Sequence, residues 1–172
     1  MTTDNDKLRE LTSAQDQPVL AETANEKVLH PLLVFRVGSR MFGAEAHHVH
    51  EVVVSSSITP VPTARSYVLG ITLVRGRLVP VVSLGELLGF QSRGEAAPTL
   101  PRLLILRDGP LEVAVMSDAT LGLYDVDMTD VGTAKAARPE CIAAELAFRD
   151  SLLLLLAVPE LLRSLTSDRG LH

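Results

Sequence analysis

Short apolar runs, each ended by a turn signal, follow one another along most of the chain. The first two are residues 32–37 and 40–46, with Gly38-Ser39 between them. Both runs have the length of a strand, and glycine followed by a small polar residue is typical of a tight turn. The pattern therefore predicts a β-hairpin at the start of the domain, which we expect to begin at Pro31.

A second hairpin is predicted more sharply. Residues 67–74 and 77–82 are apolar and rich in β-branched side chains, and only Arg75 and Gly76 separate them. A two-residue loop closes a tight turn when its glycine takes a positive φ. Arg75 is thus expected at the tip of an apolar ribbon, either as a solvated side chain or as a recognition group held in place.

The remaining elements follow from spacing, turn residues and prolines. Ser83 and Glu86 are spaced as in a capping box, so a short helix closed by Gly89 is expected next. The other predicted elements are a helical turn leading into a strand over 47–54, an extended connector over 55–66, a hairpin of 102–107 and 111–118 around Asp108-Gly109, a strand within 120–131, irregular chain over 132–143, a hairpin of 145–148 and 151–158, and a terminal helix begun by Pro159.

These strands are short, are joined by tight turns and alternate with only brief helices. That combination favours small antiparallel barrels over a parallel sheet covered by helices. The predicted fold class is therefore mainly β. The turn-rich stretch near 90–100 is predicted as the seam between two halves of the domain.

Charge and polarity set the predicted ends of the domain. Residues 1–30 are polar, and their six acids and three bases contribute −3 to the net charge of −5. Such a segment buries too little apolar surface to fold by itself, so we expect a flexible tail. The domain is predicted over residues 31–166, followed by a short tail at 167–172.

Composition excludes several classes of protein. The chain has 172 residues, is 47% hydrophobic and 22% charged, and carries a net charge of −5, which argues against nucleic-acid binding. With one cysteine, Cys141, no internal disulfide is possible, as is common in a reducing compartment. The longest apolar run, residues 152–158, is too short to span a bilayer, and the first ten residues lack an apolar signal core. We therefore expect a cytoplasmic protein with no direct membrane insertion.

The residues that commonly carry catalysis are missing or isolated. Cys141 has no histidine nearby in the sequence, and neither a G-x-S-x-G elbow nor a phosphate-binding glycine loop occurs. Six aromatic residues and no tryptophan make a stacking platform for bases or sugars improbable. The sequence predicts a protein that works through its surface, without enzymatic activity and without a cofactor.

One cluster leaves a metal site open as a less favoured alternative. His47 and His50 are three residues apart, a spacing that lets two rings face one ion on a helix, and His48 lies between them. Glu45 and Glu51 could add oxygen ligands, but no cysteine or further spaced histidine completes a set of four. The competing interpretation is a partly exposed turn beside a barrel.

Several stretches stand in a specific order over roughly residues 32–165. They read VFRVGSRMFGAEAHHVHEV, ITPVP, YVLGITLVRGRLVPVVSL, VAVMSDATLGL and FRDSLLLLLAVPELL. Together they resemble the CheW family of chemotaxis coupling proteins, with Asp118 at the acidic position of that family's "V-D-x-V" strand. The resemblance implies two SH3-like, five-stranded barrels packed side by side. It also implies an adaptor that joins chemoreceptor cytoplasmic tips to the regulatory domain of a CheA-type histidine kinase.

The resemblance also implies partner-binding residues. Arg75 matches the arginine of the family's "L-R-G" turn, and Glu51 matches the glutamate of "V-x-E-V", so the two are expected to form an ion pair beside the receptor-binding surface. Val49, Gly70 and Thr59 match positions near that surface. For Val49 a core role, and for Gly70 relief of a strand bend, are equally good explanations, while Thr59 is better explained as a connector residue.

The chain also departs from the family pattern. Leu73 stands where an asparagine is usual, Val74 replaces a leucine, and Ala44 and Ala46 replace larger aliphatic residues. Residues 131–146 match poorly, so no kinase contacts are carried over from that stretch. The departures keep open a divergent paralogue that binds the kinase without receptors, as a decoy or localisation factor, in a pilus, gliding or surface-sensing pathway.

Overall fold

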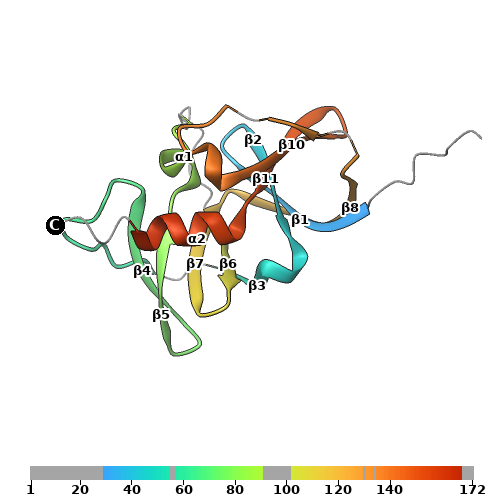
Figure 1. Ribbon diagram of the computed structural model, residues 1–172. Helices are drawn as coiled ribbons and strands as arrows, with labels where there is room; N and C mark the ends of the chain where they lie inside the picture. The colour runs from blue at the N-terminus through green and yellow to red at the C-terminus, as the bar shows by residue number, and fades with distance from the viewer. Residues whose placement is uncertain (1–28, 55–56, 91–101, 130, 134, 168–172) are drawn as a thin grey trace, which may run out of the picture.

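Two β-sheets, packed against each other with a helix between them, make up the described part of the chain (Figure 1). The computed structural model describes residues 29–54, 57–90, 102–129, 131–133 and 135–167. Within them, the first sheet has six strands in the order β8-β1-β2-β11-β10-β9, and the second has five in the order β3-β6-β7-β5-β4. The prediction of a mainly β fold is confirmed.

The bounds of the elements are as follows. The first sheet contains β1 (Leu29–Val37), β2 (Arg40–Glu45), β8 (Ala119–Asp127), β9 (Val131–Gly132), β10 (Ile142–Phe148) and β11 (Ser151–Leu156). The second sheet contains β3 (Val49–Val54), β4 (Val68–Val74), β5 (Arg77–Val82), β6 (Arg102–Asp108) and β7 (Leu111–Ser117). The helical segments are the 3₁₀ turns η1 (Ala46–His48) and η2 (Pro139–Cys141) and the α-helices α1 (Leu84–Leu87) and α2 (Val158–Ser167).

The two sheets divide the chain differently from the predicted seam. The strands on either side of the 90–100 stretch, β5 and β6, belong to the same sheet, so the seam prediction is wrong. The chain instead enters the second sheet through η1 and returns to the first between β7 and β8. The first sheet combines both ends of the described chain through a parallel pair, β2 with β11, which no local turn signal could indicate.

Apolar side chains of the described residues pack into three clusters. A shared core takes residues from both sheets and from α1 and α2; its largest fully buried members are Phe35, Phe42, Leu84, Leu88, Leu104 and Leu106. Each sheet also has a core of its own. The first sheet's core is Leu32, Val34, Val126, Ala144, Leu146, Phe148, Leu153 and Leu155, and the second sheet's core is Val74, Val79, Val81, Leu103, Ile105 and Ala114.

This arrangement explains the uninterrupted apolar runs of the sequence. Side chains along a strand alternate between its two faces. On β11, Leu153 and Leu155 enter the first sheet's core, whereas Leu154 and Leu156 enter the shared core. The runs in β1 and β6 divide in the same way, so the central stretches 32–35, 103–106 and 153–156 are apolar at every position because both of their faces are buried.

Turn chemistry is largely as predicted, with adjustments at the ends of elements. The Ser83 side chain accepts a hydrogen bond from the Glu86 amide at 3.4 Å at the start of α1, and Gly89 follows with φ +70°. Helix α2 begins at Val158, one residue before the predicted Pro159, because the Ala157 carbonyl already accepts from the Leu161 amide at 2.9 Å. No helix of the described residues is both long and apolar enough to cross a membrane.

Five sequence predictions are corrected by the described residues. Leu29 and His30 belong to β1, so the ordered domain begins before the predicted Pro31. Ser167 belongs to α2, so the domain also extends one residue past the predicted end. The rest of the two predicted tails lies outside the described residues. The stretch predicted to be irregular holds η2 and the start of β10. The helical turn expected around Val49 lies just before it, in η1, and β9 adds a sixth, two-residue strand to the first sheet.

The small residues of the first hairpin do not leave a gap. Ala44 is fully buried, and beside it a Cβ added to Gly43 would lie 2.9 Å from Leu153 Cδ2. Leu153 on β11 therefore fills the space beside Gly43 in the first sheet's core, whereas Ala44 is buried in the shared core on the other face of β2. Asp118 ties the same hairpin to β8: its carboxylate accepts a hydrogen bond from the Gly38 amide at 2.5 Å.

Candidate protein-interaction site

The β4–β5 hairpin holds Arg75 at its tip. Val74 pairs with Arg77, and the two residues between them, Arg75 and Gly76, have φ +47° and φ +80°. Positive φ at both positions is the type I′ turn that suits the twist of a two-residue hairpin. For a non-glycine residue this conformation costs about 1–2 kcal/mol, so the surrounding contacts must hold Arg75 in place.

The main contact of Arg75 is an ion pair with Glu51. Its Nε donates to Glu51 Oε2 at 2.8 Å. The Arg75 side chain is 77% exposed, while that of Glu51 is 13% exposed. The ion pair that the family resemblance implied is therefore present, with a nearly buried carboxylate anchoring an exposed guanidinium.

This ion pair bridges the two edges of the second sheet. Glu51 lies on β3 and Arg75 follows β4, and these strands stand at opposite ends of the sheet order. A sheet whose edge strands meet closes into a barrel. The Arg75–Glu51 pair thus fastens one end of the barrel.

Three further charged side chains extend the pair into a network. Arg77 Nη1 donates to both carboxylate oxygens of Glu112, at 2.9 and 2.6 Å, and its Nη2 lies 3.8 Å from Glu51 Oε1. Arg107 Nη2 donates to Glu112 Oε1 at 3.4 Å. Arg77 and Glu112 were missed by sequence reasoning. The contact between Arg107 and Glu112 could have been predicted, because these residues are cross-strand partners in the predicted hairpin around Asp108-Gly109.

The network holds Glu51 in its ionised form. The hydrogen bond from Arg75 holds the pKa of the Glu51 carboxyl below its ordinary value, against an opposing effect of burial. The charges of Arg75, His50 and Arg77 act in the same direction as the hydrogen bond. Glu51 in turn raises the pKa of Arg75.

Gly70 and Thr59 lie together at the other end of the barrel closure. Thr59 and Ile71 exchange two backbone hydrogen bonds of 2.8 and 2.9 Å. Gly70 has φ +148°, and a Cβ added to it would lie 2.3 Å from the Thr59 carbonyl oxygen. Gly70 is buried, so its position is explained by the close approach of two backbones.

Between the two closures, β3 and β4 border a groove of about 200 Å³. Glu51 and Arg75 line its charged end, and Val53, Val54 and Leu73 contribute apolar surface. The neighbouring face of the hairpin is apolar as well. Leu73 and Leu78 are cross-strand partners that are 65% and 69% exposed.

Val49 stands apart from these closures, among the histidines. It is half-buried at the start of β3 and packs against the shared core. His47 and His48 lie on η1 and His50 lies on β3, so the helical spacing on which the metal hypothesis relied is not formed. In the described part of the chain no three side chains of the metal-binding types are grouped to hold an ion.

The comparisons with known proteins assign this architecture. The family model of the CheW-like domain matches residues 31–166. The chain belongs to the CheW-like domain family. Proteins of this family are non-catalytic scaffolds in chemotaxis-type signalling, which confirms the prediction of a non-enzymatic protein.

Individual relatives agree with the family match. The CheW-like chain is 32% identical to Protein FrzA of Myxococcus xanthus over 119 residues, which cover 69% of this chain and 71% of that protein. It is 29% identical to Chemotaxis protein CheW of Thermotoga maritima over 105 residues, or 58% of this chain and 68% of the relative.

A solved structure agrees with the fold. The crystal structure of the scaffolding protein TtCheW from Thermoanaerobacter tengcongensis superposes with a TM-score of 0.66 at 20% identity, covering 78% of this chain and 88% of that one. The predicted pair of SH3-like subdomains is thereby confirmed.

Proposed function

We propose that this CheW-like protein couples the cytoplasmic tip of a chemoreceptor to the regulatory domain of a CheA-type histidine kinase, in the cytoplasm at receptor arrays. The relatives named as chemotaxis proteins support the pathway. The observation that carries the proposal is the Arg75–Glu51 pair, which gives an exposed cation a defined position. Glu51 anchors this cation, and we include Val49 and Gly70 in the proposed surface on the family resemblance.

The chemistry of Arg75 suits recognition of a partner. Among the described residues, Glu51 accepts a hydrogen bond from Arg75 Nε and no group accepts one from its Nη atoms. The Nη donors are therefore available to a carboxylate or carbonyl group of the receptor. The exposed Leu73 and Leu78 lie on the same hairpin and supply apolar contact area beside the charge. Val49 and Glu51 contribute from β3, whereas Gly70 contributes by keeping the barrel closed.

Reversal of the charge at the turn tests this proposal. We expect Arg75→Glu to weaken binding of a receptor tip fragment by tenfold or more, roughly the effect of losing one buried partner-bound charge. The fold should remain intact, because the side chain lies outside all three cores, but a second carboxylate facing Glu51 should lower the melting temperature somewhat. Isothermal titration calorimetry against the tip fragment, with the kinase regulatory domain as second ligand, measures both couplings.

Arg149→Glu is the matched control. Arg149 is also an exposed hairpin-turn arginine, with φ +53°, but it belongs to the first sheet. Its variant should bind the receptor tip as the native chain does. Equal loss of tip binding in both variants, or none in either, would contradict the assignment to Arg75.

A charge exchange separates recognition from barrel closure. The double variant Glu51→Arg/Arg75→Glu can reform the ion pair with reversed sign, but its arginine then lies beside Arg77, so its stability should recover only part of the loss seen in Arg75→Glu. If binding requires the arginine at the turn, receptor affinity stays low in the double variant. Recovery of affinity would show that closure alone matters.

Leu73 favours a second candidate function. This exposed leucine stands where the family usually has asparagine, so the receptor-facing surface differs in this chain. A paralogue that binds the kinase but not receptors would act as a decoy or localisation factor, in a pilus, gliding or surface-sensing pathway. The same titration distinguishes the two, because this candidate binds the kinase domain alone.

A further inference from the structure

Three histidines surround a pocket that the Arg75–Glu51 pair does not use. His47, His48, Val49 and His50 line one side of it, and the β6–β7 turn closes the other with Arg107 and Asp108; its volume is about 280 Å³. Two of the histidines, His47 and His50, are exposed, and His48 is half-buried. The pocket is therefore open to a group from solvent or from a partner.

The ring positions are defined by local contacts. The rings of His47 and His48 lie 4.0 Å apart between centroids. His48 Nδ1 lies 3.1 Å from the Arg107 carbonyl oxygen, and His47 Nδ1 lies 3.4 Å from Glu45 Oε2. The pocket thus has a fixed wall on η1, while the His50 ring is presented from β3.

The net charge around the pocket depends on the histidines. The charged groups contributed by the surrounding described elements are Glu45 of β2, Glu51 of β3, Arg75 and Arg77 of the β4–β5 hairpin, Arg107 and Asp108 of β6, Glu112 of β7, and Glu160 and Arg163 of α2. Four arginines among them face five carboxylates. The neighbourhood is therefore close to neutral when the histidines are neutral, and becomes positive when they are protonated.

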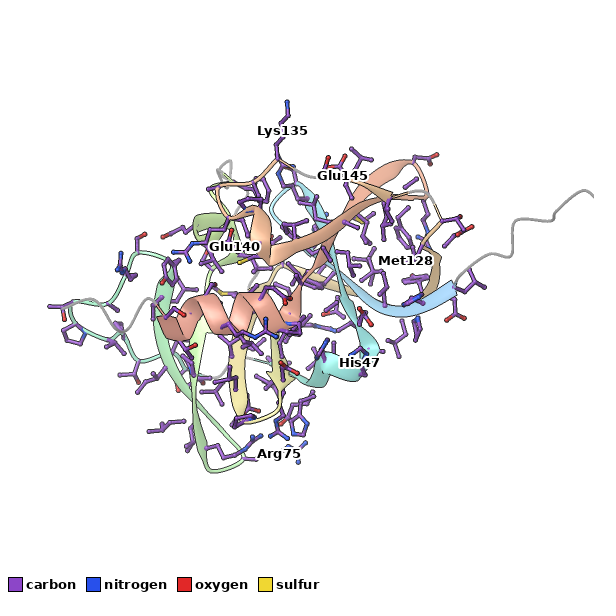
Figure 2. The ribbon with its side chains drawn as sticks, viewed as in Figure 1. His47, Arg75, Met128, Lys135, Glu140 and Glu145 are labelled. Carbon is purple, nitrogen blue, oxygen red and sulfur yellow. The ribbon has the colours of Figure 1, made fainter. Side chains whose placement is uncertain are left out.

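We propose that this histidine pocket is a docking site for an acidic side chain of the protein bound at Arg75, and that its affinity increases as the pH falls. The inference rests on the proposed function. A partner's carboxylate is favoured because the pocket joins the same surface: Arg107 belongs both to the pocket and to the network that reaches Arg77 and Glu51. His47 and Arg75 also both lie in the lower half of the molecule as viewed in Figure 2.

The sign of the pH dependence follows from histidine chemistry. Histidine is the side chain that ordinarily changes charge between about pH 5 and 8. A protonated ring attracts a carboxylate, so binding takes up protons and is strengthened by acidification. When the rings are neutral, the only positive charges nearby among the described residues are arginines that already pair with carboxylates of this chain, such as Arg77 and Arg107 with Glu112. The pocket then attracts a partner's carboxylate only weakly.

The test is calorimetric titration of the full chain with a receptor cytoplasmic tip fragment at about pH 6 and about pH 8, at constant ionic strength. We expect binding to be roughly fivefold tighter at the lower pH. The variant His47→Gln/His50→Gln should reduce this difference to less than about twofold. Both side chains are exposed, so the variant should fold, and His48→Gln provides a second, independent change.

His30→Gln is the matched control, because His30 lies on β1, in the first sheet. It should keep the full pH dependence. A pH dependence that survives in the double variant and in His48→Gln, or one that is absent from the native chain although the tip binds, overturns the histidine pocket alone. Failure of the tip to bind at both pH values overturns the proposed function together with this inference.

Discussion

Arg75 and Glu51 show how one residue positions another. Glu51 is nearly buried on β3, and the hydrogen bond from Arg75 lowers its pKa and so keeps it charged. Arg75 is exposed and adopts an uncommon backbone conformation, yet the carboxylate fixes its direction. An exposed ion pair contributes little to stability in general. The value of this one lies in orientation, which explains why both residues belong to the proposed site.

The lowered pKa of Glu51 predicts how stability depends on pH. A carboxyl whose pKa is lower in the folded state contributes stability above its unfolded pKa and loses it as the pH falls through the folded value. Glu51→Gln should therefore be less stable than the native protein at about pH 7, with the gap shrinking towards about pH 3. Urea unfolding of both proteins across this range measures it; a gap that widens on acidification would contradict the assignment.

At the scale of elements, closure of the second barrel depends on two contacts, one from β3 to the turn after β4 and one from Thr59, which follows β3 in the chain, to β4. The Arg75–Glu51 pair closes one end, and the Thr59–Ile71 backbone bridge closes the other. The bridge requires a glycine at position 70, because any Cβ there would collide with the Thr59 carbonyl. The sequence interpretations of Gly70, relief of a strand bend or a place at the receptor surface, stay predictions, while the close approach of Thr59 gives a structural reason for glycine here.

Gly70→Ala should accordingly be strongly destabilising. We expect a loss of about 3 kcal/mol or more in the free energy of unfolding, because the clash involves backbone atoms that cannot move aside without breaking the bridge. Gly109→Ala is the control: it also has positive φ, but nothing lies within 4 Å of an added Cβ. Its cost should be about 1 kcal/mol. Equal losses in the two variants, measured by denaturant titration, would refute the close-approach argument.

At the scale of the whole molecule, the shared core joins two barrels that each have a core of their own. Strands β1, β6 and β11 bury side chains on both faces, and α2 covers the shared core with Leu161 and Leu162. A tightly packed interior is hardly compressible, so the two barrels should move together as one rigid body. Two barrels joined in this way suit a scaffold that must hold two partners in a fixed relative position.

Two leucines on the same face of β11, one exposed and one buried, test the importance of the shared core. Leu154 is 3% exposed and lies in the shared core, whereas its neighbour Leu152 is 62% exposed. Leu154→Ala should lower the free energy of unfolding by about 2–5 kcal/mol, whereas Leu152→Ala should change it by less than about 0.5 kcal/mol. Chemical denaturation followed by circular dichroism gives both values. Similar losses would mean that Leu154 does not pack in the shared core as described.

Local features of the chain were enough to predict its hairpins, its capping box and its mainly β character, because turns and strand alternation depend on neighbouring residues. The Arg75-Gly76 turn is the clearest case, and the Arg75–Glu51 pair followed only with the help of the family resemblance. The sequence could not indicate which strands share a sheet, that β2 pairs with β11, or that Arg77 and Glu112 complete the network. Those pairings join residues distant in sequence, and they form because they bury both faces of β1, β6 and β11, a condition that exists only in the assembled tertiary structure.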